Sequence, residues 1–227
     1  MPVSPASGNG RPFVILIGQY DSPFVRRVGI ALTLYGMAYQ QWPWSSFFDA
    51  DRIRVYNPLT RVPTLLLDDG TVLTESHIIL DYLDGLMPER ARLFPVAQPA
   101  RHQALQIAAL ATGIGDKAVS LFYERFLHAE TSALWVERCV RQIVTTLGVL
   151  ETERAGRSTP YWFGDRIGHA DIATGAVLRF LDEAHPGIVR LTDYPSLAAF
   201  SARLEALPVF RTISQKFIPP VGPAAAA

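Results

Sequence analysis

The sequence contains a single cysteine among its 227 residues, and this scarcity excludes several kinds of chemistry. Cys139 cannot form an internal disulfide, and no Cys-x-x-Cys pair is present for redox cycling or zinc binding. The histidines are scattered without the spacing of metal ligands: His77, His102, His128, His169 and His185. We therefore expect no metal site, and a reducing compartment.

Excess charge and long apolar runs are also missing. Lysine plus arginine equals aspartate plus glutamate at 21 each, so net charge favours neither nucleic acid nor an anionic membrane as a partner. No segment approaches the roughly 20 apolar residues that span a bilayer. Residues 1–11 lack the apolar run of a secretory signal. These features predict a cytoplasmic protein with a small-molecule ligand.

What is present is a core-forming composition, with 49% hydrophobic residues. The exceptions are residues 1–12 and 219–227, which are rich in proline, glycine, serine or alanine and are expected to be disordered.

The first half of the chain alternates strand and helix patterns. The run 13–17 is continuously apolar, as in a strand buried on both faces, and Asp69-Gly70 is a hairpin turn signal. We expect a domain over residues 13–87 with the order βαβαββα: strand 13–17, a helix from Pro23 that stops at Gly36, strand 39–44, helix 49–55, strands 64–67 and 71–73, and a helix starting near Ser76.

The second half shows only helical periodicity. Residues 88–100 are rich in proline and arginine without a regular period, and we interpret them as a linker. Residues 101–218 predict an all-α domain, with helices over 101–127, 131–154, 169–184 and 195–206.

Three local features carry chemistry. Ser22 precedes Pro23 as an N-cap residue, beside unpaired backbone N–H groups that stabilise an anion. Val62-Pro63 opens a strand, where proline accompanies a sharp turn of the chain. Glu75 and Ser76 begin a helix, whose N–H groups suit a carboxylate while Glu75 suits an ammonium group. Taken singly, each is also an ordinary capping or turn feature.

Together and in this order, the features resemble the glutathione transferase superfamily. Residues 20–28 are similar to the active-site motif of serine-type members, residues 57–65 to their cis-proline segment, and residues 75–79 to their γ-glutamyl site. Residues 164–172 resemble the capping motif of their helical domain, with Gly168 where the family usually has serine or threonine. The bacterial, tau, theta and zeta types are the serine-type groups most similar in pattern.

The resemblance implies a thioredoxin-like α+β domain followed by a helical-bundle domain, and glutathione as co-substrate. Ser22 would donate a hydrogen bond to the glutathione sulfur, Val62 would pair its backbone with the cysteinyl part, and Pro63 would be cis. Glu75 and Ser76 would hold the γ-glutamyl end. The implied enzyme is a glutathione transferase that acts on small hydrophobic electrophiles as a homodimer.

Several residues keep two interpretations. Tyr20 could donate to the thiolate in place of Ser22, and Arg61 could reach a glutathione carboxylate. Arg26 and Arg27 fit a solvated helix face better than ligand steering.

Two further sets of residues are assigned from their position in the sequence. An aromatic cluster is assigned to the core or to a dimer contact: Trp42, Trp44, Phe47 and Phe48. The candidates for lining an electrophile pocket are Ile114, Ala118, Phe122 and Tyr123.

Two competing functions remain open. A glutathione-dependent peroxidase or thiol transferase would use the same thiolate, although glutaredoxin-like relatives place a cysteine where this chain has Ser22. A non-catalytic protein of the same fold would bind glutathione or a partner without turnover.

Overall fold

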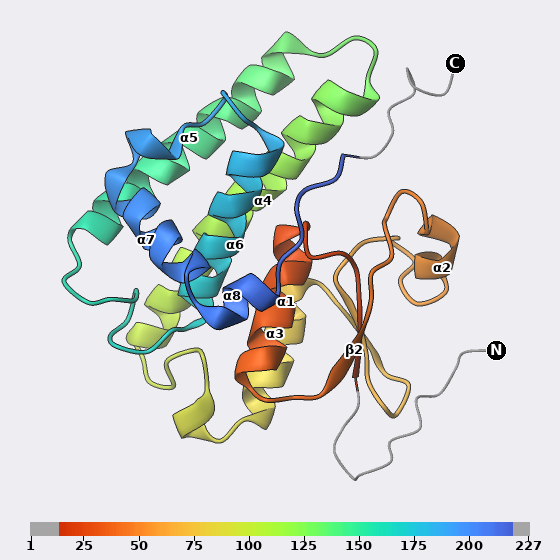
Figure 1. Ribbon diagram of the computed structural model, residues 1–227, viewed down its shortest axis with the longest axis vertical. Coiled ribbons are helices and arrows are strands. Elements are labelled where there is room, and N and C mark those ends of the chain that lie inside the picture. Colours follow the sequence, from red (N-terminus) through yellow and green to blue (C-terminus); the bar gives the residue numbers. More distant parts are fainter. Residues whose placement is uncertain (1–13, 220–227) are drawn as a thin grey trace. The chain divides into compact units, whose positions relative to one another are not determined.

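The computed structural model describes residues 14–219, so the segments predicted to be disordered fall outside the described residues except for Pro219. The described chain forms two compact units (Figure 1). The first contains the described residues up to Leu93 together with Pro208–Gln215. The second contains Phe94–Leu207 and the described residues from Lys216 onward.

The first unit has the predicted order of elements. Its bounds are β1 Val14–Ile17, α1 Pro23–Leu34, β2 Tyr39–Trp42, α2 Ala50–Arg54, β3 Thr64–Leu66, β4 Val72–Thr74, α3 Ser76–Leu86, the 3-10 helix η1 Glu89–Ala91, and α8 Pro208–Thr212. The order βαβαββα is therefore confirmed. The second strand is shorter than the predicted 39–44, because Pro43 has no N–H to donate and the Trp44 N–H turns back to the Trp42 carbonyl at 2.8 Å.

The four strands form one sheet in the order β2-β1-β3-β4. β2 is parallel to β1, whereas β3 is antiparallel to both β1 and β4. One row of this sheet joins Trp42, Ile17, Thr64 and Thr74, in that strand order. Neighbouring strands lie about 4.8 Å apart, so one end of each strand lies close to the others along this row, which we call the sheet edge.

Both faces of the sheet are covered. α1 and α3 contact each other (Figure 1). α1 also contacts β1, and α3 also contacts β4. Ile53 of α2 packs into a cluster with Ile15, Ile17 and Leu66. Every residue of β1 is buried, as its continuous apolar run predicts.

The aromatic cluster divides between two roles. Trp42 and Trp44 stack with ring centroids 4.7 Å apart and pack against the cluster around Ile53. Phe47 and Phe48 are 39% and 66% exposed. The two tryptophans therefore belong to the core of the first unit, and the two phenylalanines belong to its surface.

α8 groups with the first unit, whereas the sequence placed residues up to 218 with the helical domain. Arg26 holds it there, because its Nε donates to the Ile213 carbonyl and its Nη2 to the Phe210 carbonyl, both at 2.9 Å. The Arg26 guanidinium also lies 5.2 Å from the Phe210 ring centroid. The expectation that Arg26 and Arg27 face solvent is wrong, because they are 2% and 1% exposed.

The second unit is helical. Its elements are α4 Ala100–Leu127, α5 Ala133–Ala155, α6 His169–Ala184, the 3-10 helix η2 Leu191–Asp193, and α7 Pro195–Glu205. α4 packs against α5 and α6, and α7 packs against the same two helices. The predicted fold class, an α+β thioredoxin-like domain followed by an all-α domain, is confirmed.

The start of α6 follows its sequence signals. The Asp171 carboxylate accepts from the N–H of Gly168 at 2.7 Å and from the N–H of Trp162 at 2.8 Å. Gly168 itself contributes no side-chain cap. Asp171 therefore satisfies backbone donors on both sides of the turn before α6.

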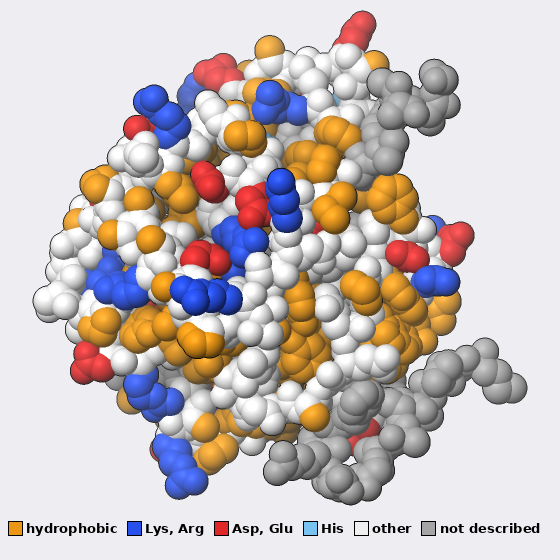
Figure 2. Space-filling model, viewed as in Figure 1, with side chains coloured by type: hydrophobic (Ala, Val, Ile, Leu, Met, Phe, Trp, Pro, Cys, Tyr) orange, Lys and Arg blue, Asp and Glu red, His pale blue; other side chains and the backbone are white. Residues whose placement is uncertain are grey.

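The surface carries charges of both signs, as the equal numbers of acidic and basic residues predict. Figure 2 shows acidic and basic side chains interspersed over the visible face. Within residues 14–219, none of the helices combines the length and apolar character that a membrane span requires.

Candidate functional site

The three predicted motifs emerge from one edge of the sheet. Ser22 follows the end of β1 at Ile17, Pro63 directly precedes Thr64, and Glu75 directly follows Thr74. Ile17 pairs with Thr64, which pairs with Thr74. The register of three strands therefore collects segments that are far apart in the sequence.

Gly18 brings the first two motifs into contact. Its φ of +130° is rarely adopted by residues with a side chain. A Cβ at this position would lie 2.5 Å from Val25 Cγ2 and 2.9 Å from Val62 Cβ. The absence of a side chain at Gly18 thus allows the first turn of α1 to approach the loop that carries Val62.

Ser22 is the N-cap residue of α1. Its backbone is extended (φ −69°, ψ 123°), and its Oγ accepts from the Val25 N–H at 3.4 Å, a long and weak bond. In this bond the hydroxyl is the acceptor, so its proton remains available for donation. Ser22 is only partly buried, which leaves this hydroxyl accessible to a ligand.

Tyr20 directs its hydroxyl elsewhere. Its oxygen lies 2.7 Å from the Tyr39 hydroxyl, and its ring packs on Gly29, where a Cβ would be 2.7 Å from Tyr20 Cε1. Tyr39 pairs with Val14, at the opposite end of β1 from Ser22. Burial, together with the Tyr39 hydroxyl, raises the pKa of Tyr20, so its phenol is a poorer acid than usual.

The Val62–Pro63 peptide bond is cis, as predicted. Asn57 braces the loop in which it lies: its Nδ2 donates to the Arg61 carbonyl and to Thr64 Oγ1, each at 3.0 Å. Asn57 is 2% exposed, so these bonds are shielded from water. The sequence analysis did not single out Asn57.

Glu75 has an unusual backbone, with a φ of 65° that is strained for a residue bearing a side chain. Its carboxylate does not cap α3. Instead, Glu75 Oε1 lies 3.1 Å from Arg61 Nη1, and the two side chains are 47% and 55% exposed. The structure therefore brings Arg61 to the Glu75 site, at the surface.

Ser76, the first residue of α3, is 3% exposed and accepts a hydrogen bond from Arg27 Nη1 at 3.3 Å. The sequence analysis preferred a solvated helix face for Arg27 over a role at the ligand, and its burial contradicts that preference. A signal was available, because Arg27 lies three residues after Phe24 and four before Ala31, on the apolar stripe of α1. Arg27 thus links α1 to the start of α3.

His77, next to Ser76, offers a pH-dependent prediction. Partial burial of the ring and then the charge of Arg27 lower the pKa of His77 to about 4, from 6.5. The folded state therefore binds this proton more weakly than the unfolded chain. Stability linked to His77 is fully present above pH 6.5 and is lost as the pH falls toward 4.

We expect NMR titration of the imidazole signals to find His77 still neutral at pH 5.5, with His77→Gln used for assignment. The same variant should flatten the loss of unfolding free energy between pH 6.5 and 4. A His77 signal titrating at 6.5 in the folded protein would contradict the prediction.

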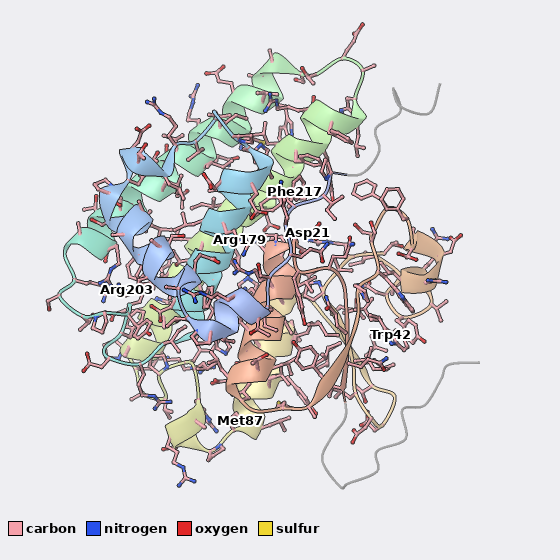
Figure 3. The ribbon with its side chains drawn as sticks, viewed as in Figure 1. Asp21, Trp42, Met87, Arg179, Arg203 and Phe217 are labelled. Atoms are coloured by element: carbon pink, nitrogen blue, oxygen red, sulfur yellow. The ribbon has the colours of Figure 1, made fainter. Side chains whose placement is uncertain are left out.

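The candidates for an electrophile pocket lie on α4. Ile114 and Ala118 are 2% and 0% exposed, whereas Tyr123 is 37% exposed. Phe122 packs edge-on against Phe217 with ring centroids 5.0 Å apart, and Figure 3 labels Phe217 beside the helices of the second unit. Their role as a pocket lining remains a prediction.

Residues 14–219 contain no further candidate for a metal site or a reactive thiol. No cluster of histidine, cysteine, aspartate or glutamate there is arranged to hold a metal ion. Cys139 is 0% exposed within α5.

Comparison with known proteins agrees with this geometry. The family model "Glutathione S-transferase, N-terminal domain" matches residues 16–91, and "Glutathione S-transferase, C-terminal domain" matches residues 133–203. A solved glutathione S-transferase from Methylobacterium radiotolerans, in complex with glutathione sulfonate, is 31% identical with a TM-score of 0.83. The alignment covers 92% of this chain and 99% of that one. This chain belongs to the glutathione S-transferase family.

Other members of the family support the assignment. A glutathione transferase family member from Pseudomonas fluorescens Pf-5, solved with bound glutathione, is 32% identical over 92% of this chain and 100% of its own, with a TM-score of 0.76. Glutathione S-transferase Z1 from Arabidopsis thaliana is 29% identical over 220 residues, or 90% of this chain and 93% of that protein. The predicted class of enzyme, a glutathione transferase, is thus confirmed at the level of the family.

Proposed function

We propose that this protein binds glutathione at the sheet edge that carries Ser22, Val62 and Ser76, and joins glutathione through its sulfur to small hydrophobic electrophiles. The observation that carries the proposal is the shared row of Ile17, Thr64 and Thr74, from which all three motifs emerge. Relatives of similar length have been solved with glutathione or its sulfonate bound.

The cysteinyl and γ-glutamyl parts of the tripeptide each have a partner at this edge. The Val62 backbone pairs with the cysteinyl residue in the manner of an added strand. The Glu75 carboxylate takes the γ-glutamyl ammonium group, while the Ser76 hydroxyl and the first N–H groups of α3 take the α-carboxylate. The ion pair between Arg61 and Glu75 supports a role for Arg61 in contacting a carboxylate of the ligand.

Ser22 activates the thiol. Its hydroxyl donates to the glutathione sulfur, and the positive end of α1 favours the thiolate, so the proton is released to solvent. Each unit by which the thiol pKa falls corresponds to about 1.4 kcal/mol of preference for the charged form. The thiolate sulfur then attacks the electrophilic carbon and a C–S bond forms. In a substitution, the leaving group departs with its electron pair; in addition to an isothiocyanate, the C=N electron pair moves to nitrogen, which takes a proton from solvent.

Two observations favour Ser22 over Tyr20 as the donor. The Ser22 oxygen accepts its cap bond and keeps its proton for a ligand, at the edge where the other motifs meet. The Tyr20 hydroxyl is paired with Tyr39, and its pKa is raised.

A panel of glutathione-dependent assays tests the reaction class. We expect conjugation of an aryl halide and of an isothiocyanate, because the glutathione thiolate can attack an electrophilic carbon without help from a protein cysteine. Activity restricted to an organic peroxide or a mixed disulfide would instead support the peroxidase or thiol transferase alternative. Glutathione binding without any turnover would support the non-catalytic alternative.

We also propose that the protein is a homodimer. Phe47 and Phe48, which are 39% and 66% exposed, form an apolar surface that a second copy would cover. Light scattering at micromolar concentration is expected to return twice the chain mass of 25.1 kDa. The double variant Phe47→Ser, Phe48→Ser should shift the equilibrium toward monomer, whereas a wild-type monomer would refute the proposal.

A further inference from the structure

The Arg27 guanidinium is buried but incompletely paired. Its Nη1 donates to Ser76 Oγ at 3.3 Å, whereas Nε and Nη2 have no hydrogen-bond partner among the described residues. No carboxylate of residues 14–219 forms an ion pair with it. Arg26, equally buried, donates from Nε and Nη2 to two backbone carbonyls. The two adjacent arginines therefore bind different partners.

An unpaired buried cation is costly to maintain. Arg27 is 1% exposed, and burial lowers its pKa to about 10, which still leaves it protonated at neutral pH. Removing a charge from water without a counter-ion destabilises a folded protein. An anion bound beside the guanidinium would offset this cost.

The surroundings indicate where this anion binds. Arginine has donors only, so in the bond from Arg27 the Ser76 oxygen accepts and its own proton is left to donate. Glu75 makes no side-chain cap on α3, a helix of 11 residues. The Ser76 hydroxyl, the first N–H groups of α3 and the positive charge of Arg27 therefore lie together at the start of α3, and this set of donors suits a carboxylate.

We propose that Arg27 is a positioning and specificity residue, which orients the Ser76 hydroxyl and supplies the positive charge that selects ligands with a carboxylate at the start of α3. This inference rests on the proposed function, in which that group is the α-carboxylate of the γ-glutamyl residue. The favoured ligand class is γ-glutamyl thiols with a free α-carboxylate. Thiols that lack this group lose the benefit of the buried charge.

The test combines affinity and stability in one variant. Arg27→Met keeps much of the side-chain volume and removes the charge. We expect the Kd for glutathione, measured by calorimetry, to rise about tenfold, the scale of one lost charge-assisted interaction. The melting temperature should stay unchanged or rise, because the buried charge is gone. A residue with only a structural role would show the opposite pattern, with reduced stability and unchanged affinity.

Arg90→Met is the control for net charge. Arg90 is exposed in η1, beyond Met87 at the far end of α3, where Figure 3 labels Met87. Its removal should leave both measurements unchanged. Arg27→Lys, which keeps the charge, should recover part of the affinity. Arg27→Gln, which keeps a donor without charge, replaces the methionine variant if that variant does not fold.

A second ligand identifies the group that Arg27 recognises. The analogue 4-aminobutyryl-cysteinylglycine has the thiol and the amine of glutathione but no α-carboxylate. Wild type and Arg27→Met should bind this analogue with equal affinity, so the variant loses the preference for glutathione. Equal weakening of both ligands would overturn the inference while leaving glutathione binding in place. A wild-type protein that binds neither thiol would overturn the proposed function, and the inference with it.

Discussion

Replacing Ser22 by alanine is expected to lower kcat/KM for glutathione conjugation about 10- to 100-fold, because one hydrogen bond to a charged sulfur is lost, at roughly 1.5–3 kcal/mol. The fold should persist, since the cap bond from Val25 is already long at 3.4 Å. The decisive measurement is the apparent pKa of bound glutathione, followed by thiolate absorbance, which should rise toward the value of the free thiol.

Two control variants separate activation from capping. Ser22→Gly also lacks the hydroxyl but costs only a few tenths of a kcal/mol at an N-cap, so it should match alanine in activity and exceed it in stability. Tyr20→Phe removes the other candidate donor and should leave the thiol pKa unchanged. If Ser22→Ala retained full turnover and Tyr20→Phe lost it, the role of donor would pass to Tyr20.

Replacing Gly18 by alanine is expected to lower the free energy of unfolding by about 2–6 kcal/mol. Two effects combine: about 1–3 kcal/mol for a side chain at φ +130°, and about 1–3 kcal/mol for the overlap with Val25 and Val62. The unfolding midpoint in urea measures the loss. Since Val62 must move to make room, glutathione binding should also weaken in the variant that remains folded.

Gly70→Ala is the matched control for Gly18→Ala. Gly70 also has a positive φ, of 86°, but no atom lies within 4 Å of a Cβ built on it. Its variant should therefore show the backbone cost alone, about 1–3 kcal/mol, without an effect on glutathione affinity. Equal losses at both glycines would show that the contact between Gly18 and Val62 contributes nothing.

Local signals determined the elements of this protein. Ser22-Pro23 marks the start of α1, and the apolar run before it becomes a fully buried strand. Helix 169–184 has the predicted bounds, and Asp171 caps its first turn as its spacing from Gly168 indicates. These features follow from residues within one or two turns of each other, because capping and periodicity are properties of neighbouring residues.

The tertiary structure decided which of these residues meet. The register Ile17–Thr64–Thr74 gathers Ser22, Val62 and Ser76 at one edge, and Gly18 permits the closest approach between two of the motifs.

The helical pattern of α1 places Arg27 on the apolar stripe, but it does not indicate the partners of Arg26 and Arg27. Arg26 reaches the Phe210 and Ile213 carbonyls, and Arg27 reaches Ser76. The physical reason is that burial of a charged side chain depends on partners distant in sequence. A single-sequence pattern does not contain that pairing, whereas the packed sheet and helices do.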